Sequence, residues 1–386
     1  MHCIIWRVVN VRYKRSSKAA GERSSHNRED AVQGQKWSRR KVLRASAVSM
    51  AGVLFAEPLK AAALPPTAVT PELIEAARKE GKISYYAAIE LNVAERLGKM
   101  FEAKYPGITV RVERSGAERI FQRIAQEQDS GIHAVDVANS TDVSHYLEWK
   151  KKGWLAPYLP EDVVKHFPAD QVDPDGLYAT ACAWVEAIGY NTDLVKAEDA
   201  PRSYADLLDP KWQGKMVKGH PSYSGAILTT TFVLARDLGW PYLEKLAQQK
   251  VMQVQSAGDP PKKIMLGERA VMVDGNDYNL VLFKDQGKPV EVVHPKEGSP
   301  LIIVPCGVFE SAPNPNAARL FQSFFFSREA QQMLVDEFAH RSFHAEVKPR
   351  AGQTPMSSLK LLKSDPVAVQ AQSEELKARY AKVFRV

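Results

Sequence analysis

Serine, glycine, aromatic and acidic residues gather at points of the sequence where a strand-like run gives way to a helical pattern. Such residues offer hydroxyl groups and free backbone N–H groups, which suit anions and polar oxygen atoms at the start of a helix. The candidate binding residues at these points are Tyr86, Ser115, Gly116, Ser140, Asp142, Ser222, Tyr223, Ser224, Gly225, Asp277 and Tyr278. Ser224 would also suit the N-cap of the helix predicted to begin near Gly225, without any ligand.

Aromatic residues near these points could form flat walls around a small organic molecule. They include Tyr86, Trp184, Tyr223 and Tyr278. Only one of Tyr85 and Tyr86 can face such a site, because neighbours on a strand point to opposite sides, and we favour Tyr86. The alternative is that both tyrosines are ordinary core and surface residues of one strand.

Charged residues indicate which groups a ligand would carry. Arg119 falls in the first turn of a predicted helix, where the helix dipole disfavours a cation, so it suits a ligand carboxylate or phosphonate. A surface ion pair with a neighbouring glutamate is the alternative. Asp142, Asp274 and Asp277 point instead to an ammonium group, and a ligand of both signs would use both sets. We expect a small polar organic solute with an anionic group.

Short β-type runs and amphipathic helical runs alternate along the chain and would position these residues. Residues 82–88 are typical of a strand, and residues 92–107 place Val93, Leu97 and Phe101 on one helical face. Repeated units of this kind predict an α/β fold with a parallel, doubly wound sheet, whose ligands bind at the carboxyl ends of the strands. The chain is too long for one comfortable core, so we expect two lobes.

The charge is divided unevenly along the 386 residues. Residues 1–63 hold 13 Lys and Arg against 4 Asp and Glu, whereas residues 64–386 hold 39 against 41. The overall net charge of +7 therefore belongs to the N-terminal segment, and the remainder has no basic field for nucleic acid or a membrane surface. Cys182 and Cys306 could pair in an oxidising compartment, although buried free thiols are the commoner outcome.

The N-terminal segment has the features of an export signal. Arg39 and Arg40 precede the uncharged run Ala45–Ala56, which is too short to span a bilayer, and small residues around Ala63 form a cleavage site. We expect a twin-arginine signal peptide over residues 38–63 and a periplasmic mature protein. Residues 1–37 lack periodicity and predict a disordered extension or a start codon assigned too early.

Motifs that would indicate catalysis are missing from the sequence. The string "SYSGA" lacks the first glycine of a G-x-S-x-G nucleophile turn. The phosphate loop, the G-x-G-x-x-G fingerprint and the H-E-x-x-H helix are also absent. We therefore expect a binding protein without a cofactor. An α/β hydrolase remains the alternative from another class.

Several strings in order over some 270 residues resemble the periplasmic solute-binding proteins of ABC importers, in the subgroup of ferric-ion, thiamine and phosphonate binders. They are "FEAKYPGITV", "GWLAPYLP", "IGYNTDLV", "SYADLLDPKWQGKM", "HPSYSGA", "LGERAVM", "KEGSPLIIVP" and "SAPNPNAARLFQSFFFSREAQQML". The resemblance implies a type II fold of two α/β lobes, each a mostly parallel sheet flanked by helices, joined by hinge strands. Matched onto this chain, lobe 1 comprises 64–182 plus 301–386, and lobe 2 comprises 183–300.

The resemblance also implies partners and a choice of ligand. The partners are the solute, an ABC permease and an ATPase in the inner membrane, and we expect a monomer that binds no nucleic acid. Ferric-ion members hold iron with adjacent tyrosines, whereas this chain offers only Tyr278, flanked by Asp277 and Asn279. An organic solute is therefore favoured. Iron, with Tyr278 and Asp277 as ligands, is the alternative.

Overall fold

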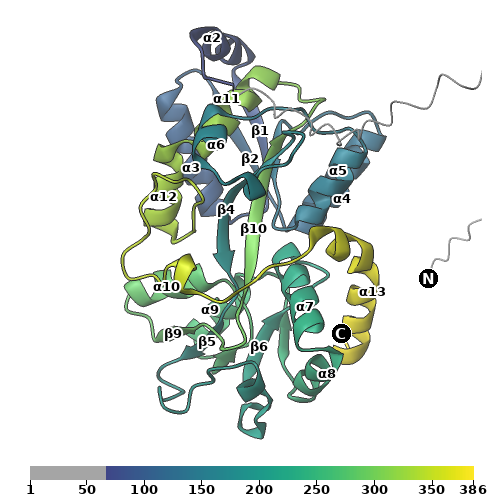
Figure 1. The fold of residues 1–386 in the computed structure, drawn as a ribbon, viewed down its shortest axis with the longest axis vertical. Coiled ribbons are helices and arrows are strands. Elements are labelled where there is room, and N and C mark those ends of the chain that lie inside the picture. Colours follow the sequence, from purple (N-terminus) through teal and green to yellow (C-terminus); the bar gives the residue numbers. More distant parts are fainter. Residues whose placement is uncertain (1–66) are drawn as a thin grey trace, which may run out of the picture. The chain divides into compact units, whose positions relative to one another are not determined.

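The computed structural model describes residues 67–386, which lie in one compact unit (Figure 1). The predicted signal peptide and the extension before it lie outside the described residues. Two β-sheets with helices on their faces build the unit, so the predicted α/β fold of two lobes is confirmed.

The lobe 1 sheet has the strand order β2-β1-β3-β10-β11, and β4 pairs with β10 beside this path. Its parallel part is β2-β1-β3, whereas β10 runs antiparallel to both β3 and β4. The strands are β1 (Lys82–Ala87), β2 (Thr109–Arg114), β3 (Val137–Asn139), β4 (Ala179–Val185), β10 (Ser299–Val308) and β11 (Leu361–Leu362).

Helices cover the lobe 1 sheet and share one aromatic core with it. The predicted apolar face of α3 is confirmed, since Val93, Leu97 and Phe101 are buried. Tyr85 of β1 packs on Phe321 of α11 with ring centroids 5.0 Å apart. The lobe 1 helices are α2 (Pro71–Glu80), α3 (Leu91–Lys104), α4 (Ala117–Asp129), α5 (Val143–Lys151), α6 (Glu161–His166), α11 (Pro315–Phe326) and α12 (Arg328–Phe338).

The lobe 2 sheet has the strand order β7-β6-β8-β5-β9, in which β5 is antiparallel to both neighbours. Each sheet is thus mixed, with a parallel half where the β–loop–α units lie. The strands are β5 (Ile188–Asn191), β6 (Met216–Gly219), β7 (Met252–Val254), β8 (Val271–Met272) and β9 (Val290–Val293). The helices are α7 (Gly225–Asp237), α8 (Trp240–Gln248), α9 (Asp259–Met265) and α10 (Asp277–Asp285). Four 3-10 turns complete the fold: Ala169–Gln171, Ala205–Leu208, Pro210–Trp212 and Met356–Ser358.

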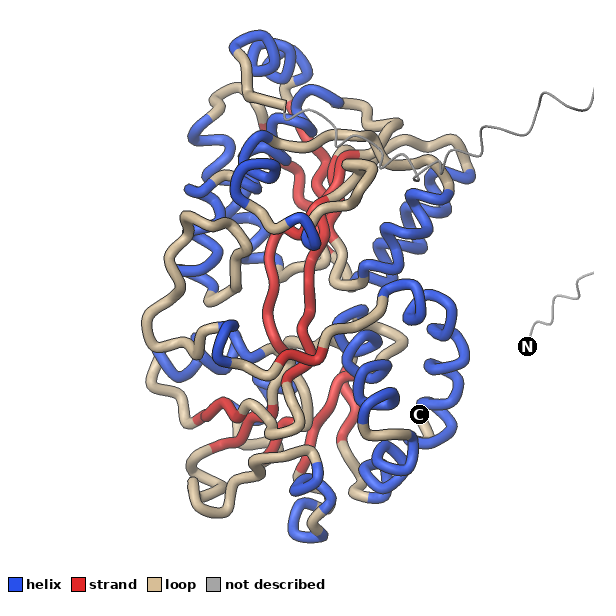
Figure 2. Tube along the Cα trace, in the orientation of Figure 1, coloured by secondary structure: helices blue, strands red, loops and turns tan. Residues whose placement is uncertain are grey.

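Strands β4 and β10 join the two lobes. They run antiparallel side by side, with Leu301 opposite Val185 and Cys306 opposite Ala179 (Figure 2). The chain passes from β4 to β5 through residues 186–187 and returns from β9 to β10 through residues 294–298. The lobe boundaries expected at 182/183 and 300/301 therefore fall inside these two strands.

The C-terminal helix α13 (Pro366–Phe384) contacts both lobes, although we expected residues 301–386 to belong to lobe 1 alone. It packs on α5 of lobe 1 and on α7 and α8 of lobe 2. Lys377 lies 3.3 Å from the carboxylate of Glu118 in α4, while the Tyr380 hydroxyl donates to Gln253 at 2.7 Å. The helix thus forms a second bridge between the lobes (Figure 1).

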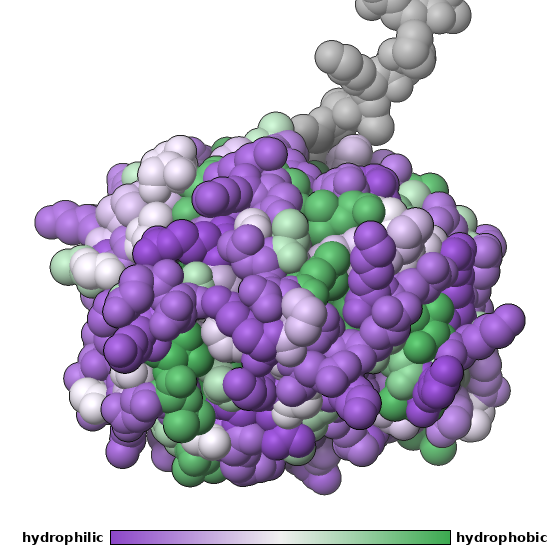
Figure 3. Space-filling view, turned by 90° about the horizontal axis from the view of Figure 1, so that it is seen from below, coloured by the Kyte–Doolittle hydropathy of each residue, from purple (hydrophilic) through white to green (hydrophobic). Residues whose placement is uncertain are grey.

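Cys182 and Cys306 are buried and unpaired, and burial raises the pKa of both thiols. Among residues 67–386, no helix combines the length and the apolar character that crossing a membrane requires. The face in Figure 3 is mainly hydrophilic, with its hydrophobic residues in separate small patches.

Candidate functional site

A cavity of about 260 Å³ lies between the lobes, at the carboxyl ends of β1 and β2 and at the start of α4, α7 and α9. Residues of both lobes line it, as the alternation of strands and helices predicts for a ligand site. Six of the sequence-predicted residues are among them: Gly116, Arg119, Trp184, Tyr223, Ser224 and Tyr278.

Two arginines line the cavity. Arg114 ends β2, and Arg119 stands in the first turn of α4, so both guanidinium groups lie beside the N-terminus of that helix. Arg114 donates to the Ile89 carbonyl at 3.3 Å, and Arg119 reaches Gln255 of lobe 2 at 3.5 Å. Neither arginine forms an ion pair with an acidic group of residues 67–386, so their charges are available to an anion.

The lining of the cavity also includes residues with acceptor atoms. Tyr278 donates its hydroxyl proton to Oε1 of Glu90, and Asn276 Nδ2 donates to the Tyr278 oxygen at 2.7 Å and to Glu90 Oε1 at 3.4 Å. Within the described part of the chain, Oε2 of Glu90 and Oδ1 of Asn276 are buried and have no hydrogen-bond partner. Both residues line the cavity.

Aromatic rings form the wall beside these acceptors. The ring of Trp184 meets that of Tyr278 edge to face at 5.3 Å, and His340 packs behind both rings, 5.4 and 4.6 Å away. Burial lowers the pKa of His340 to about 4, which keeps the imidazole neutral. Burial, followed by the charge of Glu90, raises the pKa of Tyr278 well above its usual value, so the phenol keeps its proton.

Two glycines let the lobes touch beside the cavity. A Cβ atom on Gly116 of lobe 1 would lie 2.9 Å from the Tyr223 carbonyl oxygen of lobe 2. A Cβ atom on Gly225 would lie 2.8 Å from that of Asp142. Ser224 caps α7, since its hydroxyl oxygen accepts from the Ile227 N–H at 3.4 Å, and it also lines the cavity. The N-cap role and the binding role considered from the sequence are therefore compatible.

Tyr86 lies away from the cavity. Its hydroxyl donates to Glu127 at 3.0 Å, and Arg123 covers its ring at 4.5 Å. Tyr85 points to the opposite side of β1, as neighbours on a strand must, and is buried in the aromatic core of lobe 1. The interpretation of both tyrosines as structural residues of one strand fits these positions.

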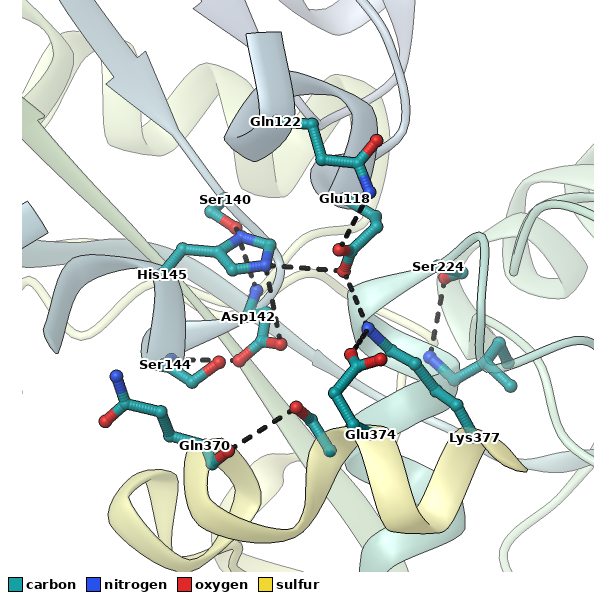
Figure 4. Close-up of polar contacts among 12 residues, drawn as sticks. Glu118, Gln122, Ser140, Asp142, Ser144, His145, Ser224, Gln370, Glu374 and Lys377 are labelled. Atoms are coloured by element: carbon teal, nitrogen blue, oxygen red, sulfur yellow. Dashed lines mark hydrogen bonds and ion pairs between the residues drawn. The ribbon is translucent and has the colours of Figure 1, made fainter. Parts of the chain in front are cut away.

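Other predicted residues serve the fold at the edge of the site. Ser115 and Ser222 hold loop geometry through their backbone N–H groups, which donate to the Ala87 carbonyl and to Nδ1 of His220. Ser140 and Asp142 lie in a polar cluster next to α13, where Ser140 contacts His145 at 2.9 Å and Asp142 caps α5 (Figure 4). None of these four side chains is part of the cavity lining.

The predicted acidic residues of lobe 2 also have partners of their own. Arg341 lies 2.7 Å from the carboxylate of Asp277, and Lys218 lies 2.6 Å from that of Asp274, with both members of each pair buried. The acidic groups that do line the cavity are Glu90 and Asp259.

Sequence reasoning missed Glu90, Arg114 and Asn276. Glu90 follows the predicted strand 82–88 by two residues, and Arg114 and Asn276 directly precede the candidate residues Ser115 and Asp277. The search for candidates covered the points where a predicted strand gives way to a helix. Had it continued to the first turn of each helix, it would have included Glu90, which follows the run "SYYAAI" and is the N-cap of α3.

One cluster outside the cavity has metal-ligand residue types. Ligand atoms of Asp162, His166 and His344 lie within 4.8 Å of one another. However, Nδ1 of His344 accepts the Glu346 N–H at 3.2 Å, so its other ring nitrogen carries the proton and offers no lone pair. The two imidazole rings are stacked at 4.6 Å. We therefore assign this cluster to packing.

Comparison with known proteins gives the family. A family model described as bacterial extracellular solute-binding protein matches residues 134–358, more than half of the chain. A curated relative from Sinorhizobium fredii, a probable ABC transporter periplasmic-binding protein, is 21% identical over 291 residues, which cover 73% of this chain and 80% of the relative.

Solved structures show the same fold. The periplasmic binding protein AfuA from Actinobacillus pleuropneumoniae, with bound fructose-6-phosphate, has a TM-score of 0.72 and 21% identity, covering 79% of this chain and 99% of that one. Iron-bound HitA from Pseudomonas aeruginosa has a TM-score of 0.68 and 20% identity, covering 78% and 99%. The chain belongs to the bacterial extracellular solute-binding proteins, and the predicted resemblance to the periplasmic substrate-binding components of ABC transporters is confirmed.

Proposed function

We propose that this substrate-binding protein captures a small organic solute with an anionic group and delivers it to an ABC importer. The observation that carries the proposal is the pair of arginines, Arg114 and Arg119, which line the cavity without an acidic partner in the described residues. They lie beside the N-terminus of α4, whose free N–H groups also favour an anion.

The size of the cavity supports a small ligand. A volume of about 260 Å³ is room for a compact solute. The named ligand of AfuA, a sugar phosphate, is an example of an organic anion on the same fold.

Contacts from both lobes support a capture mechanism based on closure. A solute that contacts Arg119 in lobe 1 and Ser224 in lobe 2 stabilises the form in which the lobes touch at Gly116 and Gly225. The permease and its ATPase would then read the closed form. We propose that the protein acts as a monomer and binds no nucleic acid, in keeping with the nearly balanced charge of residues 64–386.

Export to the periplasm and the absence of catalysis belong to the same proposal. The twin-arginine pattern of residues 38–63 supports export with cleavage near Ala63. Lys218, Asp274 and Asp277 are committed to buried ion pairs, and His340 is neutral behind the wall. The hydroxyl group that a carboxylate contacts at the cavity is the phenol of Tyr278, and burial raises the pKa of this phenol well above its usual value, which supports reversible binding.

Ferric iron is the second candidate. Tyr223, Tyr278, Glu90 and Asp259 line one cavity, and oxygen donors of this kind suit a hard cation. HitA, named as iron-bound, has the same fold. Against iron stand the absence of a second tyrosine next to Tyr278 in the sequence and the commitment of Asp277, the other ligand considered for iron, to Arg341.

Isothermal titration calorimetry tests the proposal with fructose 6-phosphate, phosphoethanolamine and ferric citrate as probes. An organic anion should bind the wild type, and Arg114→Gln and Arg119→Gln should each weaken it about tenfold or more, since hydrogen bonds to charged groups contribute about 1.5–3 kcal/mol. Arg111→Gln is the control, because that side chain is 76% exposed and pairs with Glu113. Unchanged affinity in both cavity variants, or iron binding alone, would overturn the proposal.

A further inference from the structure

We propose that the solute is a zwitterion whose second pole is a primary ammonium group, held by Glu90 and Asn276, which line the same cavity as the two arginines. This inference rests on the proposed function, because it assumes that the anionic pole lies at Arg114 and Arg119.

Two buried acceptors without donors carry the inference. Oε1 of Glu90 already receives the Tyr278 hydroxyl and the Asn276 amide, but Oε2 of Glu90 has no hydrogen-bond partner in residues 67–386. The same holds for Oδ1 of Asn276. The orientation of this amide is fixed, because its nitrogen faces a carboxylate that can only accept. An ammonium group brings three donors to a place where two acceptors lack them.

Charge distinguishes an ammonium from a neutral donor such as a hydroxyl group. The protein donors on Glu90, a phenol and an amide, are both neutral, so the carboxylate charge is not compensated by the contacts it makes. Removing a carboxylate from water without an opposite charge is costly, and a bound cation offsets that cost. An alcohol would supply one donor but would leave the charge in place.

The wall next to Glu90 also suits a cation. Trp184 and Tyr278 line the cavity with rings that meet edge to face at 5.3 Å. A cation over an aromatic face gains about 0.5–2 kcal/mol, most with tryptophan. His340, which packs behind the rings, is neutral because burial lowers its pKa to about 4, so it does not repel an ammonium.

The two poles define the chemical class of the solute. One compact cavity is lined by two arginines and by an incompletely paired carboxylate. A short molecule with an acid group and a primary amine, such as an aminoalkyl phosphate, an aminoalkylphosphonate or an amino acid, places both charges on partners of opposite sign. The three acidic residues nominated from the sequence for this role do not line the cavity, and Glu90 replaces them.

A matched set of three probes tests the inference: phosphoethanolamine, 2-hydroxyethyl phosphate and ethyl phosphate, which share the phosphate and differ at the far end. Titration calorimetry at neutral pH should show that the wild type prefers phosphoethanolamine over both others by about tenfold or more. Glu90→Gln, which removes the charge and keeps the shape, should abolish this preference, so that phosphoethanolamine binds no more tightly than ethyl phosphate. Glu95→Gln, exposed on the same helix α3, is the control.

The other outcomes separate the two proposals. Equal affinity for all three probes, or a preference for the hydroxyl compound, overturns the zwitterion and leaves the anion site intact. Failure of every phosphate probe to bind, with no effect of the Arg114 and Arg119 variants on any ligand, overturns the proposed function itself. If Glu90→Gln does not fold, Asn276→Ala, which removes the second acceptor, must reduce the preference for phosphoethanolamine or the inference fails.

Discussion

Two polar regions lie side by side where the lobes meet, and they differ in how far their groups are paired. In the cavity, Arg114 and Arg119 lack acidic partners within residues 67–386, and Glu90 keeps one oxygen free of hydrogen bonds. In the neighbouring region, which we call the α13 cluster (Glu118, Ser140, Asp142, His145 and Lys377), side chains pair mainly with one another (Figure 4).

Glu118 shows how complete this pairing is. Its carboxylate lies 3.3 Å from Lys377 of α13 and 3.7 Å from His145 of α5. Burial alone would raise its pKa, but hydrogen bonding and charge from His145 and then Lys377 lower the pKa of Glu118 to about 2. The types of polar residue are therefore similar in a ligand site and in a structural cluster where the lobes meet. What distinguishes the two is whether the polar side chains find hydrogen-bond or ion-pair partners within the protein.

The largest expected effect follows from removing both cavity cations. Arg114→Gln combined with Arg119→Gln should weaken binding of the organic anion by about 100-fold or more, because two charge-assisted contacts are lost. The free energy of unfolding should stay within about 0.5 kcal/mol of the wild type, since these exposed side chains stabilise little. Calorimetric titration and urea denaturation measure the two quantities. A large loss of stability would mean that the two arginines stabilise the fold, as the α13 cluster does, and would contradict their role as ligand-binding residues.

A substitution in the α13 cluster should lower the stability of the fold and leave the ligand affinity unchanged. Glu118→Gln should lower the free energy of unfolding by about 2–3 kcal/mol, because one pKa unit corresponds to about 1.4 kcal/mol and the pKa of Glu118 is lowered to about 2. Since the folded pKa lies below the unfolded value, this stability is present above about pH 4.5 and is lost as the pH falls toward 2. Urea denaturation of both proteins at pH 7 and pH 3 checks this. A stability gap that does not shrink at pH 3 would contradict it.

Replacing a glycine at the contact between the lobes with alanine should weaken binding because it hinders closure of the lobes, without changing any contact to the ligand. In Gly225→Ala the new methyl group would meet the Asp142 side chain at 2.8 Å, and overpacking of this kind costs about 1–3 kcal/mol. We expect affinity to fall about five- to tenfold for every probe alike, with a larger radius of gyration in small-angle X-ray scattering of the liganded protein. Gly116→Ala should act in the same direction. A change in preference among probes would instead place Gly225 in the ligand site.

The smallest effect is expected at Lys377, in the middle of α13. Lys377→Met should lower the free energy of unfolding by about 1 kcal/mol, because its partner Glu118 keeps His145 and its other partner, Glu374, is mostly exposed. Ligand affinity should change less than twofold. Thermal denaturation with and without ligand measures both, and an affinity loss as large as that of an arginine variant would make α13 part of the binding machinery.

The fold and the location of the site could be predicted from periodicity. The alternation of strands and helices, the buried face of Val93, Leu97 and Phe101, and the position of the cavity at strand ends all follow from local patterns. The mixed character of the sheets could not, because the direction of β5 and β10 depends on where the chain crosses between lobes.

The finer choice of site residues depended on contacts between distant segments. Asp277 is withdrawn from the cavity by Arg341 and Asp142 by the cap of α5, while Glu90 faces Asn276 and Tyr278, nearly 190 residues away in sequence. The sequence pattern of α13 does not indicate that this helix packs on both lobes. One sequence does not reveal such partners.

Native mass spectrometry of the protein isolated from the cells that make it, without refolding, tests the central claim most directly. Our account predicts a complex with one small organic molecule, which denaturation releases and which contains an acidic group and a primary amine. An iron-sized mass that a chelator removes would contradict the account and assign the cavity, with Tyr278 and Glu90, to the metal.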